Sequence, residues 1–278
     1  DVSPLDAPLP DAVGLLPASA TGLPADLWRS SSSADIARRL EADRVEFLPA
    51  LQDLLYTIIM AELEPPSDAG PQSTLFLARI DTLLAYGALE QADALLKRSG
   101  IGNSEIFRRA FDISLLLHTE DSTCSSLRSN PDLSPTFPAR IFCLARGGDW
   151  DAAALTLETG RALGFISDAD DELLARFLEP DLADGQPPLA APKRPSPLTF
   201  RMLEAIGEPL PTTILPRAFA QSDLHTNAGW KAQIEAAERL LQTAALDPNQ
   251  LLGLYTARKP AASGGVWDRV KAVQDFDA

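Results

Sequence analysis

The chain of 278 residues is poor in the side chains that metal and redox sites use. It contains two cysteines, two histidines and two methionines. Zinc sites need three or four ligands at recognisable spacing, and neither a Cys-x-x-Cys nor a His-x-x-x-His pattern occurs. We therefore expect no metal site and no cofactor, and we interpret His118 and His225 as turn or surface residues.

Basic clusters and long apolar runs are also scarce. The 24 Lys and Arg residues stand against 39 Asp and Glu residues, which gives a formal net charge of −15, and basic runs such as Arg38-Arg39 stop at two residues. Nucleic-acid binding needs clustered cations that release counterions from phosphates. A membrane helix needs about 18 or more consecutive apolar residues, and no window approaches this. We expect neither nucleic-acid binding nor a membrane span.

The common signatures of catalysis are missing as well. Neither Gly-x-Ser-x-Gly nor Ser-x-x-Lys is present. His118 is near Cys124 in sequence, but no third group that would orient such a pair is identified. Soluble lytic transglycosylases carry long helical superhelices and a catalytic glutamate followed by serine, and no Glu-Ser dipeptide occurs here. The chain is predicted not to be an enzyme.

Two short motifs have a structural and a functional interpretation. The acids Asp168, Asp170, Asp171 and Glu172 could offer oxygens to Ca²⁺, but their spacing does not match an EF-hand loop. Acids in the first turn of a helix are stabilised by its dipole, and we prefer this interpretation. Residues 263–265 (Ser-Gly-Gly) precede a predicted helix and could hold an anion. The glycine and lysine patterns of phosphate loops are absent, so we interpret residues 263–265 as a loop that leads into the start of a helix.

The first 30 residues have no helical period and contain five prolines, each of which lacks a backbone donor. They are predicted to form an extended arm that either lies on the folded body or is mobile. The chain begins at Asp1, and this Pro-rich opening is typical of a mature terminus after removal of a signal peptide, although a trimmed chain would begin in the same way. This terminus and the two cysteines, which could form a disulfide bond, together predict an exported, periplasmic protein. The preference for Arg over Lys and the many alanines indicate a bacterial source.

The chain is organised around an internal repeat in residues 73–164. Seven residues recur in like character sixty-one positions later: Phe76, Arg79, Ile80, Leu83, Gly87, Ala92 and Leu96 return as Phe137, Arg140, Ile141, Leu144, Gly148, Ala153 and Leu157. This corresponds to two steps of a helix-turn-helix unit of about 31 residues, which predicts stacked helical hairpins. The middle unit has His118-Thr119 at its turn instead of glycine, so it is expected to be the least regular.

The third unit resembles a known repeat. Gly148-Asp149-Trp150-x-x-Ala153, with Leu157 further on, is similar to the middle of a tetratricopeptide repeat, and Gly87-Ala88-Leu89-x-x-Ala92 is a weaker copy. The chain departs from that family in the first helix, where Phe137-x-x-Arg140-Ile141 replaces Trp-x-x-Leu-Gly. The resemblance implies an α-solenoid with a concave groove that presents its surface to peptides or partner proteins.

Cys124 and Cys143 are predicted to lie on neighbouring helices. Cys124 falls in the second helix of one hairpin, and Cys143 falls in the first helix of the next. A disulfide bond between them would stabilise the fold by about 2–4 kcal/mol and would indicate an oxidising compartment. The alternative is two buried thiols that act as small apolar groups. We expect the disulfide bond.

Composition shifts divide the chain into four parts. After the arm of residues 1–30, residues 31–178 form the predicted hairpin domain, and residues 179–197, with six prolines, form a predicted linker. Residues 198–278 form a smaller helical region with a strongly amphipathic helix over Gly229–Ala245. The pattern is still amphipathic where the sequence ends at Ala278, which suggests that the native chain continues. The predicted fold class is therefore all-α.

The predicted function is a non-enzymatic protein–protein interaction scaffold of the bacterial cell envelope. Candidate groove residues are the first-helix arginines that face away from the packing seams: Arg79, Arg108, Arg109 and Arg140. The alternative is a helical accessory region of a peptidoglycan enzyme whose catalytic domain lies outside this chain.

Overall fold

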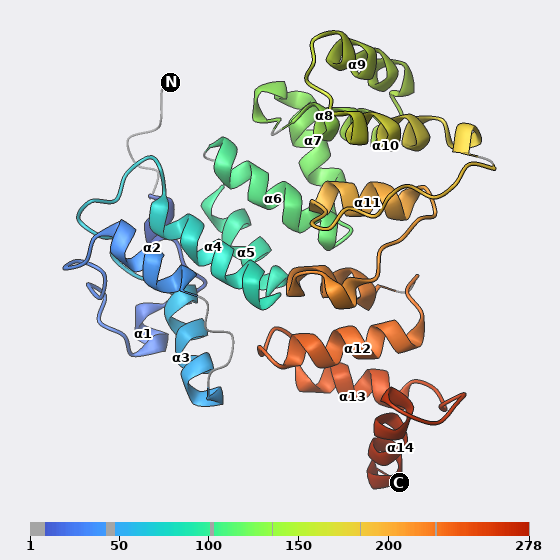
Figure 1. Ribbon diagram of the computed structural model, residues 1–278. Coiled ribbons are helices and arrows are strands. Elements are labelled where there is room, and N and C mark those ends of the chain that lie inside the picture. Colours follow the sequence, from blue (N-terminus) through green and yellow to red (C-terminus); the bar gives the residue numbers. More distant parts are fainter. Residues whose placement is uncertain are drawn as a thin grey trace. The chain divides into compact units, whose positions relative to one another are not determined.

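The computed structural model describes residues 9–42, 48–100, 103–134, 136–183, 185–225 and 227–277. The chain is about 64% helical with 2% strand, which confirms the predicted all-α class. It forms two compact units, shown with their helices in Figure 1. The first unit comprises Asp1–Gly100 and Thr212–Ala278, and the second unit comprises Ile101–Pro211.

The first unit is assembled from both ends of the sequence. Its amino-terminal elements are η1 (Pro10–Ala12), β1 (Leu16–Pro17), α1 (Ala18–Thr21), α2 (Ser33–Glu41), α3 (Pro49–Met60), β2 (Ala61–Glu62), α4 (Thr74–Tyr86) and α5 (Leu89–Ser99). Its carboxy-terminal elements are η4 (Thr212–Ile214), η5 (Arg217–Leu224), α12 (Trp230–Leu241), α13 (Pro248–Thr256) and α14 (Val266–Asp277). The two short strands pair in parallel, with Leu16 opposite Ala61.

Part of the predicted amino-terminal arm lies on the first unit. Residues 1–8 of that arm are outside the described residues, whereas the segment that follows is held by hydrogen bonds. The Asp11 carboxylate accepts a hydrogen bond from the Phe76 amide of α4 at 2.7 Å. The Glu64 amide donates to the carbonyl oxygen of Ala25 at 2.8 Å. Asp11 therefore caps the amino terminus of α4 from 65 positions away in sequence.

Buried hydrogen bonds tie the carboxy-terminal segment into the same unit. The hydroxyl of Tyr56 donates to the carbonyl oxygen of Thr243 at 2.9 Å, and the Thr243 hydroxyl donates to the carbonyl oxygen of Tyr86 at 2.7 Å. The Gln221 amide donates to the carbonyl oxygen of Gly87 at 2.6 Å. A buried polar group without a partner costs free energy, so these bonds fix the segment in place.

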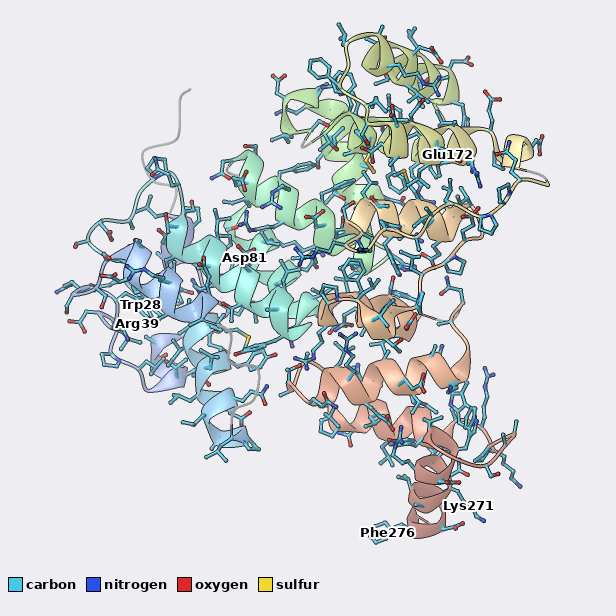
Figure 2. All side chains as sticks on the ribbon, viewed as in Figure 1. Trp28, Arg39, Asp81, Glu172, Lys271 and Phe276 are labelled. Carbon is cyan, nitrogen blue, oxygen red and sulfur yellow. A yellow bond between two sulfur atoms is a disulfide. The ribbon has the colours of Figure 1, made fainter. Side chains whose placement is uncertain are left out.

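The last helix, α14, is anchored to α12 and α13. Arg269 forms a two-point ion pair with Glu238, with both contacts at 2.6 Å. The Tyr255 hydroxyl donates to the same carboxylate at 2.5 Å. Burial, followed by this bond to Glu238, raises the pKa of Tyr255 to about 12. At the far end of α14, Phe276 is 94% exposed (Figure 2).

The second unit consists of six α-helices with two short 3₁₀ turns among its described residues. Its elements are α6 (Ser104–Leu116), α7 (Asp121–Ser129), η2 (Pro131–Leu133), α8 (Phe137–Arg146), α9 (Trp150–Ala162), α10 (Asp168–Leu178), η3 (Pro180–Ala183) and α11 (Pro197–Ala205). Each helix packs on the next in sequence, and α11 returns to pack on α6. An open stack of hairpins would leave α6 and α11 apart, so this return contact closes the set of helices.

The three predicted hairpins are α4/α5, α6/α7 and α8/α9, and each has a left-handed turn residue. Gly87 has φ +77°, His118 has φ +56° and Gly148 has φ +83°. Glycine adopts this conformation without strain, whereas His118 carries the cost of a Cβ atom. The repeat spacing thus places a left-handed residue at each turn, and the arrangement is compatible with a helical repeat fold.

The predicted linker of residues 179–197 falls inside the second unit. Arg176 donates to the carbonyl oxygen of Pro187 at 3.0 Å, and the Leu189 amide donates to the Glu208 carboxylate at 2.7 Å. Leu189 also packs on the apolar core of this unit. The division into units therefore differs from the predicted boundaries. Prolines remove donors, but their carbonyl oxygens and apolar rings still pack against the body.

Candidate functional site

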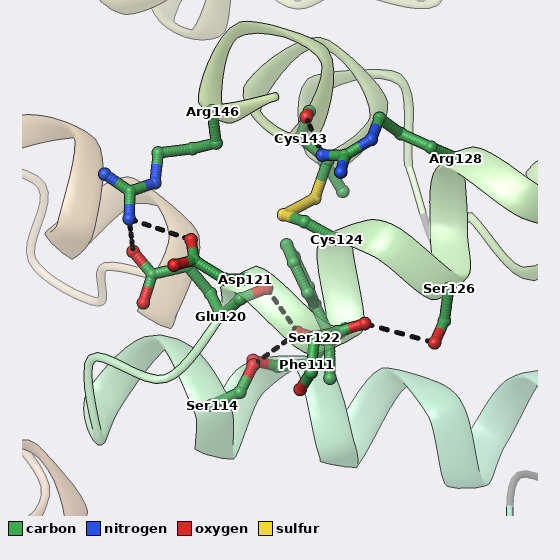
Figure 3. The surroundings of a disulfide bond; sticks show 12 residues. Phe111, Ser114, Glu120, Asp121, Ser122, Cys124, Ser126, Arg128, Cys143 and Arg146 are labelled. Carbon is green, nitrogen blue, oxygen red and sulfur yellow. Dashed lines mark hydrogen bonds and ion pairs between the residues drawn. A yellow bond between two sulfur atoms is a disulfide. The ribbon is translucent and has the colours of Figure 1, made fainter. Parts of the chain in front are cut away.

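The second unit contains a disulfide bond between α7 and α8, which confirms the predicted pairing. Cys124 and Cys143 have Cα atoms 4.9 Å apart, and both residues are fully buried. The Arg128 guanidinium of α7 donates to the carbonyl oxygen of Cys143 at 3.0 Å, as Figure 3 shows. The two helices are therefore joined by a covalent bond and, beside it, by a side-chain hydrogen bond.

A chain of ion pairs lies beside the disulfide bond. Glu120 immediately precedes α7, and only 1% of its side chain is exposed. Its Oε1 atom is 3.0 Å from Nη2 of Arg201 on α11 and 3.5 Å from Nη2 of Arg146 at the end of α8. Arg146 also contacts Asp121 at 3.0 Å, and Arg201 also pairs with Glu204 (Figure 3 draws the Arg146 contacts). The buried carboxylate thus joins α7, α8 and α11.

The central ion pair uses only part of its hydrogen-bonding capacity. Oε2 of Glu120 and Nε of Arg201 are buried without a hydrogen-bond partner in the described part of the chain. At the other end of the chain of ion pairs, Arg146 contacts its acids through Nη2. We find no hydrogen bond from Nε or Nη1 of Arg146 to any described residue, and its side chain is 41% exposed. Arg146 therefore has two nitrogens available to a further acceptor.

These residues line a pocket of about 260 Å³ in the second unit. Its polar lining consists of Glu120, Arg146 and Arg201, and its apolar lining includes Phe142, Phe177, Trp150 and Ala205. The rings of Phe142 and Phe177 stack with centroids 5.5 Å apart. A cavity of about 150 Å³ can hold benzene, so this pocket is large enough for one large apolar side chain.

Four large apolar side chains are exposed along α9 and the loop after it, and the first of them, Trp150, also lines this pocket. The exposed fractions are 51% for Trp150, 69% for Leu155, 59% for Leu163 and 61% for Phe165. We call these four residues the α9 apolar surface. The ring of Phe165 stacks on Phe137 at 5.1 Å between centroids. A second group of exposed leucines, at Leu48, Leu51 and Leu54, borders residues 43–47, which lie outside the described ranges.

Arg79, one of the predicted groove residues, is buried in the first unit. It is 1% exposed. Its three nitrogens donate to three backbone carbonyl oxygens, those of Ile59 (2.6 Å), Val13 (2.7 Å) and Ala61 (3.1 Å). Burial lowers the pKa of Arg79 to about 10, and the nearby Asp11 carboxylate opposes that shift. The prediction of Arg79 as a partner contact is therefore corrected, because the side chain is buried and holds two backbone segments of its own unit, at Val13 and at residues 59–61.

The other three predicted groove residues lie in the second unit. Arg108 pairs with Glu105 at 3.2 Å and Asp112 at 3.7 Å, and Arg109 pairs with Glu105 at 3.0 Å. Arg140 donates to the carbonyl oxygen of Pro131 at 3.1 Å and lies over the Phe137 ring at 5.7 Å. These contacts are local, and their role in binding a partner stays a prediction.

The remaining sequence motifs have structural contacts. His118 is 3.7 Å from Glu204. The Ser167 hydroxyl accepts a hydrogen bond from the Asp170 amide at 3.2 Å, which is the expected helix cap. The amide of Gly264 donates to Asp268 at 2.9 Å. Within the described residues, no group of three or more His, Cys, Asp or Glu side chains is arranged to hold a metal ion.

Sequence analysis did not identify Glu120, Arg146 or Arg201 as site residues. Glu120 and Arg201 are 81 positions apart, on helices whose contact depends on the return of α11 to the hairpins. Only one signal was available in the sequence, namely an acid directly before a helix. Such acids are common, because they are stabilised by the helix dipole.

The structure and the comparisons leave the family of this chain open. In the described part of the chain, the helices are too short or too polar to cross a bilayer. No protein-family model, curated protein or solved structure matches the chain.

Proposed function

We propose that this chain is a non-enzymatic interaction scaffold of the bacterial cell envelope and that its second unit binds a protein partner. The α9 apolar surface carries the proposal. Four of the twelve large apolar side chains that are exposed in the described residues lie within residues 150–165. Single exposed apolar residues are ordinary, whereas a concentration of them favours an interaction site.

The charge around this surface supports a partner of opposite sign. Asp149 and Asp151 are exposed at the start of α9, and the whole chain carries a formal charge of −15. A partner segment with apolar side chains flanked by Lys or Arg would complement both features. Electrostatic attraction of this kind mainly raises the association rate and falls with salt.

The disulfide bond supports export. Disulfide bonds persist in oxidising compartments such as the bacterial periplasm and are rare in the cytosol. The chain is expected to be released with the periplasmic contents, with Cys124 and Cys143 of the denatured protein resistant to alkylation until a reductant is added. Recovery with the cytosolic contents would contradict this part of the proposal.

Photo-crosslinking in the cells that make this protein tests the interaction surface. A photoreactive amino acid at Leu155 should give an adduct of higher mass, whose partner is identified by mass spectrometry. Ile214, in the first unit, is the matched control because it is 81% exposed and apolar. Equal labelling at Leu155 and Ile214, or no adduct at any residue of the α9 apolar surface, would contradict the proposal.

A further inference from the structure

The pocket beside the disulfide bond has the chemistry of a small binding site, and its ligand class follows from its lining. We propose that it binds a neutral amide with a large apolar side chain, as presented by an apolar residue within a partner's peptide chain. This inference rests on the proposed function, since it describes how a protein partner would be held by the second unit. The pocket is a separate site from the exposed side chains of α9, with which it shares Trp150.

The apolar lining sets the size and character of the ligand. Phe142, Phe177 and Trp150 provide aromatic surface, and the volume of about 260 Å³ exceeds the about 150 Å³ of a cavity that holds benzene. A Phe, Leu or Met side chain therefore fits without enlargement of the pocket. Apolar anchors in such pockets provide much of the binding free energy of protein interfaces.

The charges around the pocket disfavour a charged head group of either sign. Arg146 and Arg201 line the pocket and oppose a cation. Three carboxylates surround them, because Glu120 pairs with both, Asp121 pairs with Arg146 and Glu204 pairs with Arg201. These carboxylates oppose an anion. Transfer of an ion from water into a site costs free energy unless groups of opposite charge there stabilise it. Charges of both signs surround this pocket, so a neutral polar group is favoured.

Arg146 provides the polar contact for such a group. Its Nη2 atom is held by Glu120 and Asp121, which fixes the guanidinium beside the pocket. Its Nε and Nη1 atoms have no partner in the described residues and can donate to a carbonyl oxygen. A hydrogen bond from a charged donor is stronger than one between neutral groups. Glu120 is then a positioning residue, and Arg146 is the residue that contacts the ligand.

Three phenylalanine derivatives with the same side chain and different charge test the proposal with the purified, oxidised chain. They are N-acetyl-phenylalaninamide, which is neutral, N-acetyl-phenylalanine, which is an anion, and phenylalaninamide, which is a cation. Titrations are followed by the NMR signal of the Trp150 indole. We expect saturable binding of the neutral probe and at least about tenfold weaker binding of both charged probes. Failure of the neutral probe to shift the indole signal, or equal binding of all three, would overturn the proposal.

Variants distinguish a contact by Arg146 from a general effect on the fold. Arg146→Met should weaken binding of the neutral probe about tenfold, and Arg146→Lys should weaken it less, because the charge remains while the planar fork is lost. Arg98→Met is the matched control, since Arg98 is 55% exposed and also paired with an acid, Glu62, and it should leave binding unchanged. Unaltered binding by Arg146→Met would overturn the proposal. A pocket that fails these tests while Leu155 still cross-links a partner would leave the proposed function standing.

Discussion

At the scale of single residues, two aspartates act as helix caps across long sequence distances. Asp11 accepts from the Phe76 amide of α4, and Asp68 accepts from the Ser33 amide of α2 at 2.9 Å. Burial raises the pKa of Asp11 above its ordinary value. The backbone and hydroxyl hydrogen bonds from Ser33 lower the pKa of Asp68, which is exposed. The two caps therefore respond to acid in opposite directions.

Substitution of these caps should change the pH dependence of stability with opposite sign. Asp68 has a lowered pKa, so its contribution is present above its ordinary value of 3.8 and is lost as the pH falls through the folded value. In the variant Asp68→Asn, the free energy of unfolding should therefore fall less steeply than in the wild type as the pH drops below 3.8. Asp11 has a raised pKa, so its contribution favours the folded state at low pH and declines as the pH rises through the folded value.

Urea unfolding at about pH 3 and about pH 6 measures both effects. Asp11→Asn should lower stability more at the acid pH than at the higher pH, relative to the wild type. The same direction of change for the two variants would contradict the assignment of these pKa shifts.

The turn glycines give a second prediction at this scale. A Cβ atom at Gly87 would lie 2.5 Å from Cδ2 of Leu240, whereas a Cβ atom at Gly148 would meet nothing within 4 Å. Both residues have positive φ, so each alanine substitution costs about 1–2 kcal/mol of backbone strain. Gly87→Ala should cost about 1–3 kcal/mol more, because it also overpacks the contact with α12. Thermal and denaturant unfolding measure the stability of the Gly87→Ala and Gly148→Ala variants. Equal destabilisation by the two substitutions would argue against the close contact between Gly87 and Leu240.

At the scale of elements, the hairpins of the second unit are held by the disulfide bond and by α11. The disulfide bond joins residues 19 positions apart on neighbouring helices. Glu120 then links both helices to α11 through Arg201 and Arg146. Glu120, Arg146 and Arg201 also line the small pocket of this unit.

Removal of the disulfide bond should destabilise the second unit by about 3 kcal/mol, the value expected for a loop of this length. The double substitution Cys124→Ser with Cys143→Ser and reduction of the wild type should give similar losses. Denaturant unfolding with and without reductant measures the change. An unfolding free energy that does not depend on reductant in the wild type would contradict a stabilising role of this bond.

At the scale of the whole molecule, the two units differ in whether they are built from one segment of the sequence or from two. The second unit is continuous, whereas the first joins the amino-terminal and carboxy-terminal segments through buried bonds such as Tyr56 to Thr243. Arg79 on α4 adds a second level of assembly in the first unit, since it holds two other backbone segments, at Val13 and at residues 59–61. The first unit therefore needs both ends of the described chain, whereas the long-range contacts of the second, such as Glu120 with Arg201, stay within residues 101–211.

A fragment of residues 101–211 should fold by itself, with a cooperative unfolding transition and an intact disulfide bond. A fragment of residues 31–178, the hairpin domain predicted from the sequence, lacks Asp11, Val13 and α11 and should fold incompletely. Circular dichroism and proton–nitrogen NMR spectra compare the two fragments. A well-folded 31–178 fragment together with an unfolded 101–211 fragment would favour the boundaries predicted from the sequence.

The amino-acid sequence by itself determined the helical class, the hairpin turns and the disulfide pairing. These features depend on local periodicity and on neighbouring repeats, as in the left-handed residues Gly87 and Gly148 and the bond between Cys124 and Cys143. The burial of Arg79 and the ion pair of Glu120 with Arg201 were decided by the tertiary structure alone. An arginine on a first helix has the same local pattern whether it faces solvent or three carbonyl oxygens. Only the packing of distant segments supplies those oxygens and returns α11 to the hairpins, and it thereby forms the pocket.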